Sequence, residues 1–285
     1  LKWWAQHHSD MWNDDAVYDR ILVTTPVNPN PPSPLGINPN IDPNESRDLV
    51  IGSFSKDAIF YAYDRSDGEF LYARPTAYQN IIAGYDGTTG AYEIEPEAIM
   101  TADVEHEATI CRENRQIPQG AYSPLTNAYY VPAFNGPCSV MKLNSLEPSL
   151  DTGYNTSYIA TVPTPAGHLG QPEAINVSTG ESLWRLERET PLYGMLTTGG
   201  GLLFAADTNR RFHAVDQWTG KTLWTTILNG ASDMAPISYA VNGKQYIAVF
   251  APSGTQAAAQ HAGQLGLSAT TGVADVGHTL FVFSL

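Results

Sequence analysis

The chain has 285 residues, of which 42% are hydrophobic and 11% aromatic, and this composition excludes a disordered polypeptide. Fifteen basic and 29 acidic residues give a formal net charge of −14 at pH 7, so nucleic acid and anionic membranes would repel the chain. The sequence contains no apolar run near the ~18–20 residues that a membrane-spanning helix requires.

The first part of the chain alternates expected strands with polar loops. We expect strands at 2–6, 18–23, 50–54 and 58–63, with an acidic loop (HHSDMWNDD) at 7–15. Residues 24–44 are rich in proline and asparagine. Because proline lacks the donor that a central strand needs, we expect a long exposed excursion there. Lys56 lies on the turn between two strands, where a lysine is usually solvated.

The rest of the chain predicts further short strands and almost no helix. We expect irregular structure at 70–107, a hairpin at 120–133 and a second polar surface excursion at 142–165. Strands are expected at 174–184, 200–204, 212–224, 237–241 and 245–250, the last two joined by Asn242-Gly243, a strong hairpin signal. A Gly/Ala/Gln-rich loop is expected at 253–272, and a closing strand within GHTLFVFSL.

One phrase recurs along the chain. AVDQWTGKTLW at 214–224 repeats AINVSTGESLW at 174–184, and AYDRSDGEFLY at 62–72 is a looser copy. We refer to their common pattern, A-x-[DN]-x-x-[TD]-G-[KE]-x-x-[WY], as the repeat frame. Strand-turn-strand repeats at roughly 40–45 residues are typical of β-propeller blades. The glycine allows a left-handed turn, the Asp or Asn can bond the turn backbone, and the closing ring is expected to pack on the next blade.

Two groups of residues leave alternatives open. Grouped carboxylates in the loop at 7–15 suit a hard cation or proton abstraction, but a solvated acidic loop has the same composition. Cys111 and Cys138 could form a disulfide, which would contribute roughly 3 kcal/mol, or remain two buried thiols. A disulfide would imply an oxidising compartment such as the periplasm.

Several segments in order resemble one enzyme family. The run GGLLFAADTNRRFHAVDQWTGKTLWTTILNG, together with LKWWAQHHSDMWNDD, SFSKDAIFYAYDRSDGEFL and GAYSPLTNAYYVP, is similar to the carboxy-terminal part of the pyrroloquinoline quinone (PQQ)-dependent alcohol dehydrogenases. The resemblance implies an all-β fold, an eight-bladed propeller of four-stranded blades, of which residues 1–285 would form roughly the second half. Since the first residue is not methionine, we expect the latter part of a longer precursor or one piece of a cut chain.

The resemblance also implies a mechanism. In this family PQQ lies in the central channel beside a cation, calcium or a lanthanide, that polarises the quinone carbonyl. An aspartate takes the proton of the alcohol while hydride passes to the quinone, so the cofactor carries the redox chemistry. Electrons would then pass to a periplasmic cytochrome or quinone.

The resemblance assigns roles to residues in the acidic loop. Asn13 stands in the column of the catalytic base and of a cation ligand, and an amide cannot accept the alcohol proton. The base would then be Asp14 or Asp15, or the chemistry of this chain differs. Asp15 occupies the position of the extra cation ligand of lanthanide-using relatives. Lys56 matches the basic residue that bonds the quinone oxygens.

Other family positions depart from the pattern. Cys111 and Cys138 match a family disulfide, whereas Ile117-Pro118 replaces an expected asparagine that contacts the cofactor. Leu192-Tyr193 and Thr255, beside Gly254, stand where the family has tryptophans on the channel floor, so the cofactor pocket that Tyr193 and Gly254 would line is expected to differ there. The first-half cation ligands and stacking tryptophan have no counterpart in this sequence.

We therefore interpret the chain as part of a periplasmic oxidoreductase that oxidises an alcohol or polyol, sugar-type or polymeric substrates included. The partner half of the propeller would be needed for activity. The alternative is a non-catalytic propeller that serves as a binding or assembly module, which the loss of the base at Asn13 favours and the retention of Lys56 opposes.

Overall fold

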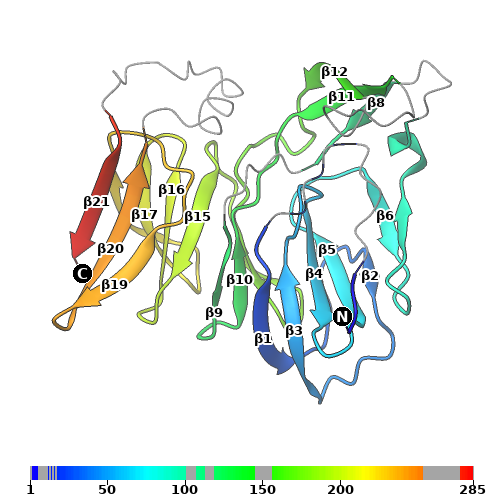
Figure 1. The fold of residues 1–285 in the computed structure, drawn as a ribbon, viewed down its shortest axis with the longest axis horizontal. Helices are drawn as coiled ribbons and strands as arrows, with labels where there is room; N and C mark the ends of the chain where they lie inside the picture. The colour runs from blue at the N-terminus through cyan, green and yellow to red at the C-terminus, as the bar shows by residue number, and fades with distance from the viewer. Residues whose placement is uncertain are drawn as a thin grey trace. The chain divides into compact units, whose positions relative to one another are not determined.

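The computed structural model describes residues 2–5, 12, 14, 16, 18–100, 107–112, 119–144, 156–252 and 277–284 (Figure 1). Over these residues the protein is built from antiparallel strands, with one 3-10 helix. The chain divides into two compact units, which are described separately below. The first comprises 1–115, 135–167 and 177–181, and the second comprises 116–134, 168–176 and 182–285.

The first unit contains three sheets. The largest has the order β1-β3-β4-β5-β2 and consists of β1 (Ile21–Pro26), β2 (Gly36–Ile37), β3 (Ser46–Gly52), β4 (Ile59–Asp64) and β5 (Phe70–Pro75). A two-stranded sheet pairs β6 (Ile82–Tyr85) with β7 (Tyr92–Ile94), and the 3-10 helix η1 follows at Pro96–Ala98. The third sheet, β12-β11-β8, consists of β8 (Glu107–Ile110), β11 (Cys138–Leu143) and β12 (Thr156–Val162).

The second unit contains three sheets in chain order. These are β9 (Ala121–Ser123), β10 (Ala128–Val131), β13 (Glu173–Asn176) and β14 (Ser182–Arg185); then β15 (Leu192–Thr197), β16 (Leu202–Asp207), β17 (Arg211–Asp216) and β18 (Thr222–Ile227); then β19 (Ile237–Val241), β20 (Lys244–Ala251) and β21 (Thr279–Ser284). One hydrophobic cluster joins the first sheet to the second, and another joins the second to the third, so the sheets stack face to face.

The turns of the repeat frame have the predicted local structure. Gly68, Gly180 and Gly220 adopt φ angles of 85°, 72° and 71°, which side-chain-bearing residues rarely adopt. The Asp216 carboxylate accepts hydrogen bonds from the backbone N–H groups of Trp218 and Thr219, at 3.0 and 2.8 Å. Its bond from the Thr219 hydroxyl, together with these backbone bonds, lowers the pKa of Asp216. The Asp side chain therefore fixes the turn, as expected.

The closing aromatic residues of the first two copies make the same contact. Tyr72 donates to the carbonyl of Val177 at 2.6 Å, and Trp184 donates through Nε1 to the carbonyl of Gln217 at 2.9 Å. Both carbonyls occupy the fourth position of the next frame. A Cβ on Gly180 or Gly220 would lie only 2.9 or 2.8 Å from these rings. The prediction that the closing ring packs on the next repeat is thus confirmed.

Trp3 makes this contact with the first copy of the frame. Its Nε1 donates to the carbonyl of Arg65 at 2.8 Å, and its ring lies 2.8 Å from where a Cβ on Gly68 would stand. Residues 2–5 were expected to begin a strand, but they form none. The aromatic contact, which strand alternation does not reveal, holds this segment instead.

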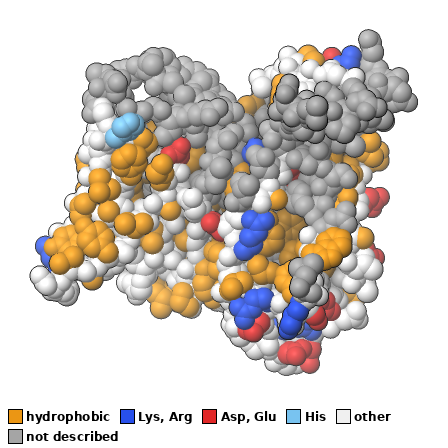
Figure 2. All heavy atoms as spheres, viewed as in Figure 1, with side chains coloured by type: hydrophobic (Ala, Val, Ile, Leu, Met, Phe, Trp, Pro, Cys, Tyr) orange, Lys and Arg blue, Asp and Glu red, His pale blue; other side chains and the backbone are white. Residues whose placement is uncertain are grey.

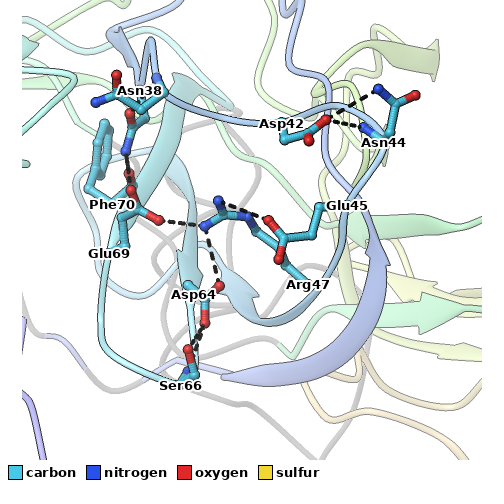
Figure 3. Close-up of polar contacts among 10 residues, drawn as sticks. Asn38, Asp42, Asn44, Glu45, Arg47, Asp64, Ser66, Glu69 and Phe70 are labelled. Carbon is cyan, nitrogen blue, oxygen red and sulfur yellow. Dashed lines mark hydrogen bonds and ion pairs between the residues drawn. The ribbon is translucent and has the colours of Figure 1, made fainter.

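A cluster of charges fixes the start of the same frame (Figure 3). Arg47 on β3 forms ion pairs with Glu45 at 3.5 Å, with Asp64 at 3.4 Å and with Glu69. Asp64, the frame aspartate, also accepts a hydrogen bond from the backbone N–H of Ser66 at 2.8 Å. The guanidinium therefore ties β3 to both sides of the turn between β4 and β5.

The proline-rich segment at 24–44 is less exposed than predicted. It contributes the end of β1 and all of β2, the two edge strands of their sheet, in agreement with the prediction that it forms no central strand. However, Val27 is fully buried, and the backbone N–H groups of Asn28 and Asn30 donate to the carbonyls of Ser178 and Thr179. Side-chain packing, which composition does not show, therefore anchors the excursion.

Two other expectations were wrong in part. The segment at 70–107, expected to be irregular, contains β5, β6, β7 and η1. In the polar excursion at 142–165, β12 pairs with β11 along its length, with one register shift. Short edge strands with polar side chains show little alternation of hydrophobic and polar residues. Whether such a segment forms a strand therefore depends on the strand with which it pairs. The hairpins at 120–133 and 237–250, and the strands at the repeat frames, are confirmed, while 253–272 lies outside the described residues.

Candidate functional site

Lys56 lies in a buried polar turn between β3 and β4. It is only 4% exposed, and its neighbours Ser53, Ser55 and Asp57 are fully buried. The backbone N–H of Ile59 donates to Asp57 Oδ1 at 3.0 Å, which closes the turn where β4 begins. A buried lysine in such a turn differs from the solvated hairpin lysine that the isolated sequence suggests. Burying charges is costly, so a specific environment must support this ammonium group.

Asp57 begins a chain of hydrogen bonds through two tyrosines. The Tyr61 hydroxyl donates to Asp57 Oδ2 at 2.5 Å and lies 2.8 Å from the Tyr85 hydroxyl. Burial, followed by the charge of Asp57, raises the pKa of both phenols well above the ordinary value. Tyr61 stacks on Phe54, Tyr85 stacks on Phe70, and the two tyrosine rings meet edge-on. The tyrosines therefore act as neutral hydrogen-bonding groups at ordinary pH.

Two residues of the acidic loop can be placed. Trp12 is fully buried in the core of the first unit, and its Nε1 donates to the carbonyl of Ala98 at 3.0 Å. Asp14 is 2% exposed, and its Oδ1 lies 3.7 Å from Nη1 of Arg112. The negative charge of Asp14 also contributes, as the smallest cause, to the raised pKa of Tyr85. Trp12 and Asp14 thus fix one end of the loop against buried aromatic and charged groups.

Arg112 connects Asp14 to the disulfide segment. Its Nη2 donates to the Tyr158 hydroxyl on β12 at 3.2 Å, and it follows Cys111 in the chain. Cys111 and Cys138 are bonded, with Cα atoms 4.2 Å apart, beside the end of the β8–β11 ladder. Of the two alternatives left open by the sequence, the disulfide is therefore correct.

The other predicted site residues are only partly placed. Tyr193 lies on β15 of the second unit, is 2% exposed and pairs with Ala206 on β16. Asn13, Asp15 and Gly254 lie outside the described residues, as do Ile117 and Pro118.

Sequence reasoning missed Asp57, Tyr61, Tyr85 and Arg112. Asp57 follows Lys56 directly and Tyr61 lies on the next strand, so the local sequence could have indicated both. The tertiary structure brings Tyr85 to Tyr61 and Arg112 to Asp14. Nothing in the local sequence of Tyr85 or Arg112 distinguishes them.

Within the described ranges, no group of three or more His, Cys, Asp or Glu side chains could hold a metal ion. The proposed cation ligands Asn13 and Asp15 lie outside those ranges. None of the helical structure in the described part of the chain is long and apolar enough to cross a bilayer.

A family model matches a segment that lies mostly in the second unit. The model described as "PQQ: Glucose/ethanol/alcohol dehydrogenase, beta-propeller domain" covers residues 160–247, which include two copies of the repeat frame.

Curated relatives extend the match over most of the chain. The dehydrogenase subunit of the quinone alcohol dehydrogenase of Acetobacter aceti is 29% identical over 84% of this chain and 32% of its own length. The 1-butanol dehydrogenase (cytochrome c) of Thauera butanivorans is 28% identical over 70% of this chain and 30% of its own length. The lanthanide-dependent methanol dehydrogenase of Methylacidiphilum fumariolicum is 26% identical over 86% of this chain and 38% of its own length. The chain thus spans about a third of the length of these relatives.

Solved structures support the fold. A europium-containing methanol dehydrogenase superposes with a TM-score of 0.76 at 22% identity, over 97% of this chain and 49% of its own. The quinohemoprotein alcohol dehydrogenase of Comamonas testosteroni gives a TM-score of 0.67 at 21% identity, over 84% of this chain and 35% of its own. With the sequence matches to quinone-dependent enzymes, these findings confirm that the chain resembles the PQQ-dependent alcohol dehydrogenases.

Proposed function

We propose that this chain is part of an oxidoreductase that oxidises an alcohol with bound PQQ and a cation. The observation that carries the proposal is the burial of Lys56 at the family position of the quinone-binding basic residue. A lysine without a ligand to bind is normally exposed, so its enclosure beside Ser55 and Asp57 favours a charged function. The proposed substrates include polyols and sugars.

We propose that residues of the first unit hold one side of such a cofactor. The ammonium group of Lys56 would hold the quinone oxygens. The chemistry that PQQ supplies when bound is acceptance of hydride, with the cation as Lewis acid. In the second unit, we propose that Tyr193 and Gly254 line the cofactor site.

The proton acceptor is proposed to be Asp14 or Asp15. Arg112, 3.7 Å from the Asp14 carboxylate, would orient that group. Asp15 would serve equally as base or as a ligand to the cation together with Asn13, and a lanthanide would favour the extra carboxylate. Calcium or a lanthanide is the proposed cation.

The remaining part of the propeller is proposed as a necessary partner. The sheet β19-β20-β21 exposes large apolar side chains on one face: Ile237, Tyr239, Val241, Leu280 and Val282. Hydrophobic side chains gather over these strands on the surface shown in Figure 2. An exposed apolar face of this kind supports the proposal that further blades complete an eight-bladed ring, of which this chain is the second half.

The proposal also covers the cellular compartment and the electron acceptor. The Cys111–Cys138 disulfide supports a periplasmic location, because disulfides persist in oxidising compartments. We propose a cytochrome or quinone as the electron acceptor. A non-catalytic binding module is the second candidate, and Asn13 in the base column is the observation that favours it.

The test is a titration of the complete protein with PQQ and calcium, and in parallel with PQQ and a lanthanide. We expect a change in quinone absorbance and alcohol-dependent reduction of an electron acceptor with at least one cation. A binding change without turnover would favour the non-catalytic module. The absence of both with every cation would contradict the proposal.

A further inference from the structure

A buried histidine in the second unit has no part in the proposed redox site. His213 lies on β17 and is 5% exposed, and Asp207, the last residue of β16, is 1% exposed. His213 Nε2 lies 3.1 Å from Asp207 Oδ2, and its Nδ1 lies 3.0 Å from Oγ1 of Thr225 on β18. Thr225 is exposed. The imidazole therefore connects a buried carboxylate to a hydroxyl group on a solvent-facing residue.

The Asp207 carboxylate is held in one orientation. Its Oδ1 accepts hydrogen bonds from the backbone N–H groups of Asn209 and Arg211, both at 2.9 Å. Its Oδ2 lies 3.5 Å from Nη2 of Arg188. Burial opposes ionisation of Asp207, but the hydrogen bonds from His213 and the Arg211 backbone, with the nearby positive charges, lower its pKa overall. Asp207 is thus ionised at neutral pH and can only accept hydrogen bonds.

The charge of Asp207 decides which nitrogen of His213 carries the proton. Since the carboxylate has no proton to give, Nε2 must be the donor in that bond. Arg188 Nη2, 3.3 Å from Nε2, is also a donor, so both nitrogens face the same carboxylate oxygen. In the neutral ring Nδ1 then accepts the hydrogen bond from the Thr225 hydroxyl. The proton of that hydroxyl therefore points at a base.

The neighbouring sheet has a different pair at the same place. His213 directly precedes the third repeat frame and Thr225 directly follows it, and the two are cross-strand partners. In the second copy of the frame these positions hold Glu173 and Arg185, which are also partners and form an ion pair at 3.0 Å. The third copy replaces this ion pair by a ring and a hydroxyl. A carboxylate, an imidazole and a hydroxyl in series are the groups that activate a hydroxyl as a nucleophile.

We propose that Thr225 is an acyl-acceptor site, with His213 as its base and Asp207 as a positioning residue. With a carboxylic ester that has a good leaving group, Thr225 Oγ1 attacks the carbonyl carbon and its proton passes to His213 Nδ1. The bond from that carbon to the leaving oxygen then breaks, and the imidazolium returns the proton to the leaving group. The products are an ester on Thr225 and a free alcohol or phenol. The inference is independent of the proposed redox function.

Two exposed residues flank the hydroxyl on the same face of the sheet. Arg211 precedes His213 by two residues, Ile227 follows Thr225 by two, and the two are cross-strand partners. Alternate residues of a strand share a face, so both lie beside Thr225. Arg211 is exposed, and Ile227 is 66% exposed. The guanidinium suits the negative charge that develops on the carbonyl oxygen, and the isoleucine favours an apolar acyl group.

The test is acylation of the 285-residue chain by p-nitrophenyl butyrate, followed by peptide mass spectrometry. Thr222 is the internal control, because it is an exposed threonine of the same strand that pairs with Val215 instead of a histidine. We expect Thr225 to be butyrylated at least tenfold faster than Thr222. The rate at Thr225 should rise with pH along a single ionisation, that of the base.

Variants separate the chemistry from a purely structural network. His213→Gln should slow acylation of Thr225 about 10²-fold or more, as loss of a general base does. Thr225→Ser keeps the nucleophile and should retain the reaction, whereas Thr225→Val should abolish it at this position. His278→Gln, elsewhere in the second unit, is the matched control and should leave the rate unchanged. Tm and far-ultraviolet circular dichroism verify the fold of each variant.

Acylation of Thr225 no faster than that of Thr222 would overturn the proposal. Equal rates at Thr225 in the unaltered chain and a folded His213→Gln variant would also overturn it, because the network would then only join strands. If His213→Gln does not fold, the ratio of the two threonines and the pH profile in the unaltered chain decide the outcome.

Discussion

The Tyr61 hydroxyl donates a hydrogen bond to the carboxylate of Asp57, and both side chains are enclosed in the first unit. This contact places a buried negative charge directly beside the sequence position of Lys56. It also connects that position, through Tyr85, to the environment of Asp14. The contact has consequences for stability that can be measured.

Alkaline pH is expected to destabilise the protein through these phenols. Burial raises the pKa of Tyr61 and Tyr85 in the folded state, so their contribution to stability is complete below about pH 10. It is lost as the pH rises above that value, because the unfolded phenols ionise and the folded ones do not. A titration of tyrosinate absorbance should show phenols that ionise only as the protein unfolds. Ionisation of all 15 tyrosines near pH 10 in the folded protein would contradict this.

Tyr61→Phe removes the donor to Asp57 while it keeps the ring. We expect a loss of about 1–3 kcal/mol in the free energy of unfolding, because a buried carboxylate oxygen loses a hydrogen bond. Tyr92→Phe, on the edge strand β7, is the comparison. Denaturant unfolding of both variants checks the difference, and equal effects would show that the Tyr61 hydroxyl has no special role.

The two closing tryptophans of the repeat frames, Trp184 and Trp224, should differ in their contribution to stability. Trp184→Ala is expected to cost about 3–5 kcal/mol, because it empties a buried site over Gly220. Trp224→Ala is expected to cost about 1 kcal/mol or less, because the ring is 42% exposed. Urea denaturation midpoints measure both. A larger loss for Trp224→Ala would contradict the role assigned to the ring-on-glycine contact.

The disulfide should contribute measurably to the first unit. Replacement of Cys111 and Cys138 by serine opens a loop with a sequence separation of 27 residues. A loop of this size predicts a loss of about 3 kcal/mol. The double variant and the single variants should lose similar amounts, because either single change also breaks the bond. Thermal unfolding with and without a reductant is the measurement, and an unchanged Tm on reduction would contradict it.

The identity of the base can be tested by restoring the family residue. Asn13→Asp in the complete protein should raise kcat if Asn13 has left the enzyme without a well-placed base. If Asp14 or Asp15 has taken over, the corresponding Asn variant should lower kcat about 10²–10⁴-fold, as loss of a general base does. Because Asp14 faces Arg112, Asp14→Asn must be accompanied by a measurement of Tm. No effect of any of the three changes on kcat would contradict the assignment.

The sequence predicted the elements that local patterns determine. The frame turns, their positive-φ glycines and the Asn242-Gly243 hairpin depend on residues within a few positions of one another, and all were confirmed. The strands β2, β6, β7 and β12 are short or polar and owe their existence to distant partners, so composition suggested loops. Val27 shows the same limit, since its burial depends on packing that no local pattern records.

The candidate site was predicted unevenly for the same reason. Lys56 was identified by a motif, but its burial required the tertiary structure. The bonds from Asp57 to Tyr61 and Tyr85 join residues on three elements, and the pairing of Arg112 with Asp14 joins distant parts of the chain. The sequence left Cys111 and Cys138 as either a disulfide or two thiols, and the structure shows that they are bonded.

The most direct test of a quinone site in the first unit is the dissociation constant of PQQ from the complete protein, measured with the activating cation present. Lys56→Met is compared with Lys244→Met, which removes an exposed lysine that stacks on Tyr246. We predict that Lys56→Met weakens PQQ binding at least tenfold, about 1.4 kcal/mol, while Lys244→Met leaves it unchanged. Equal dissociation constants for Lys56→Met and the unaltered protein would contradict the account.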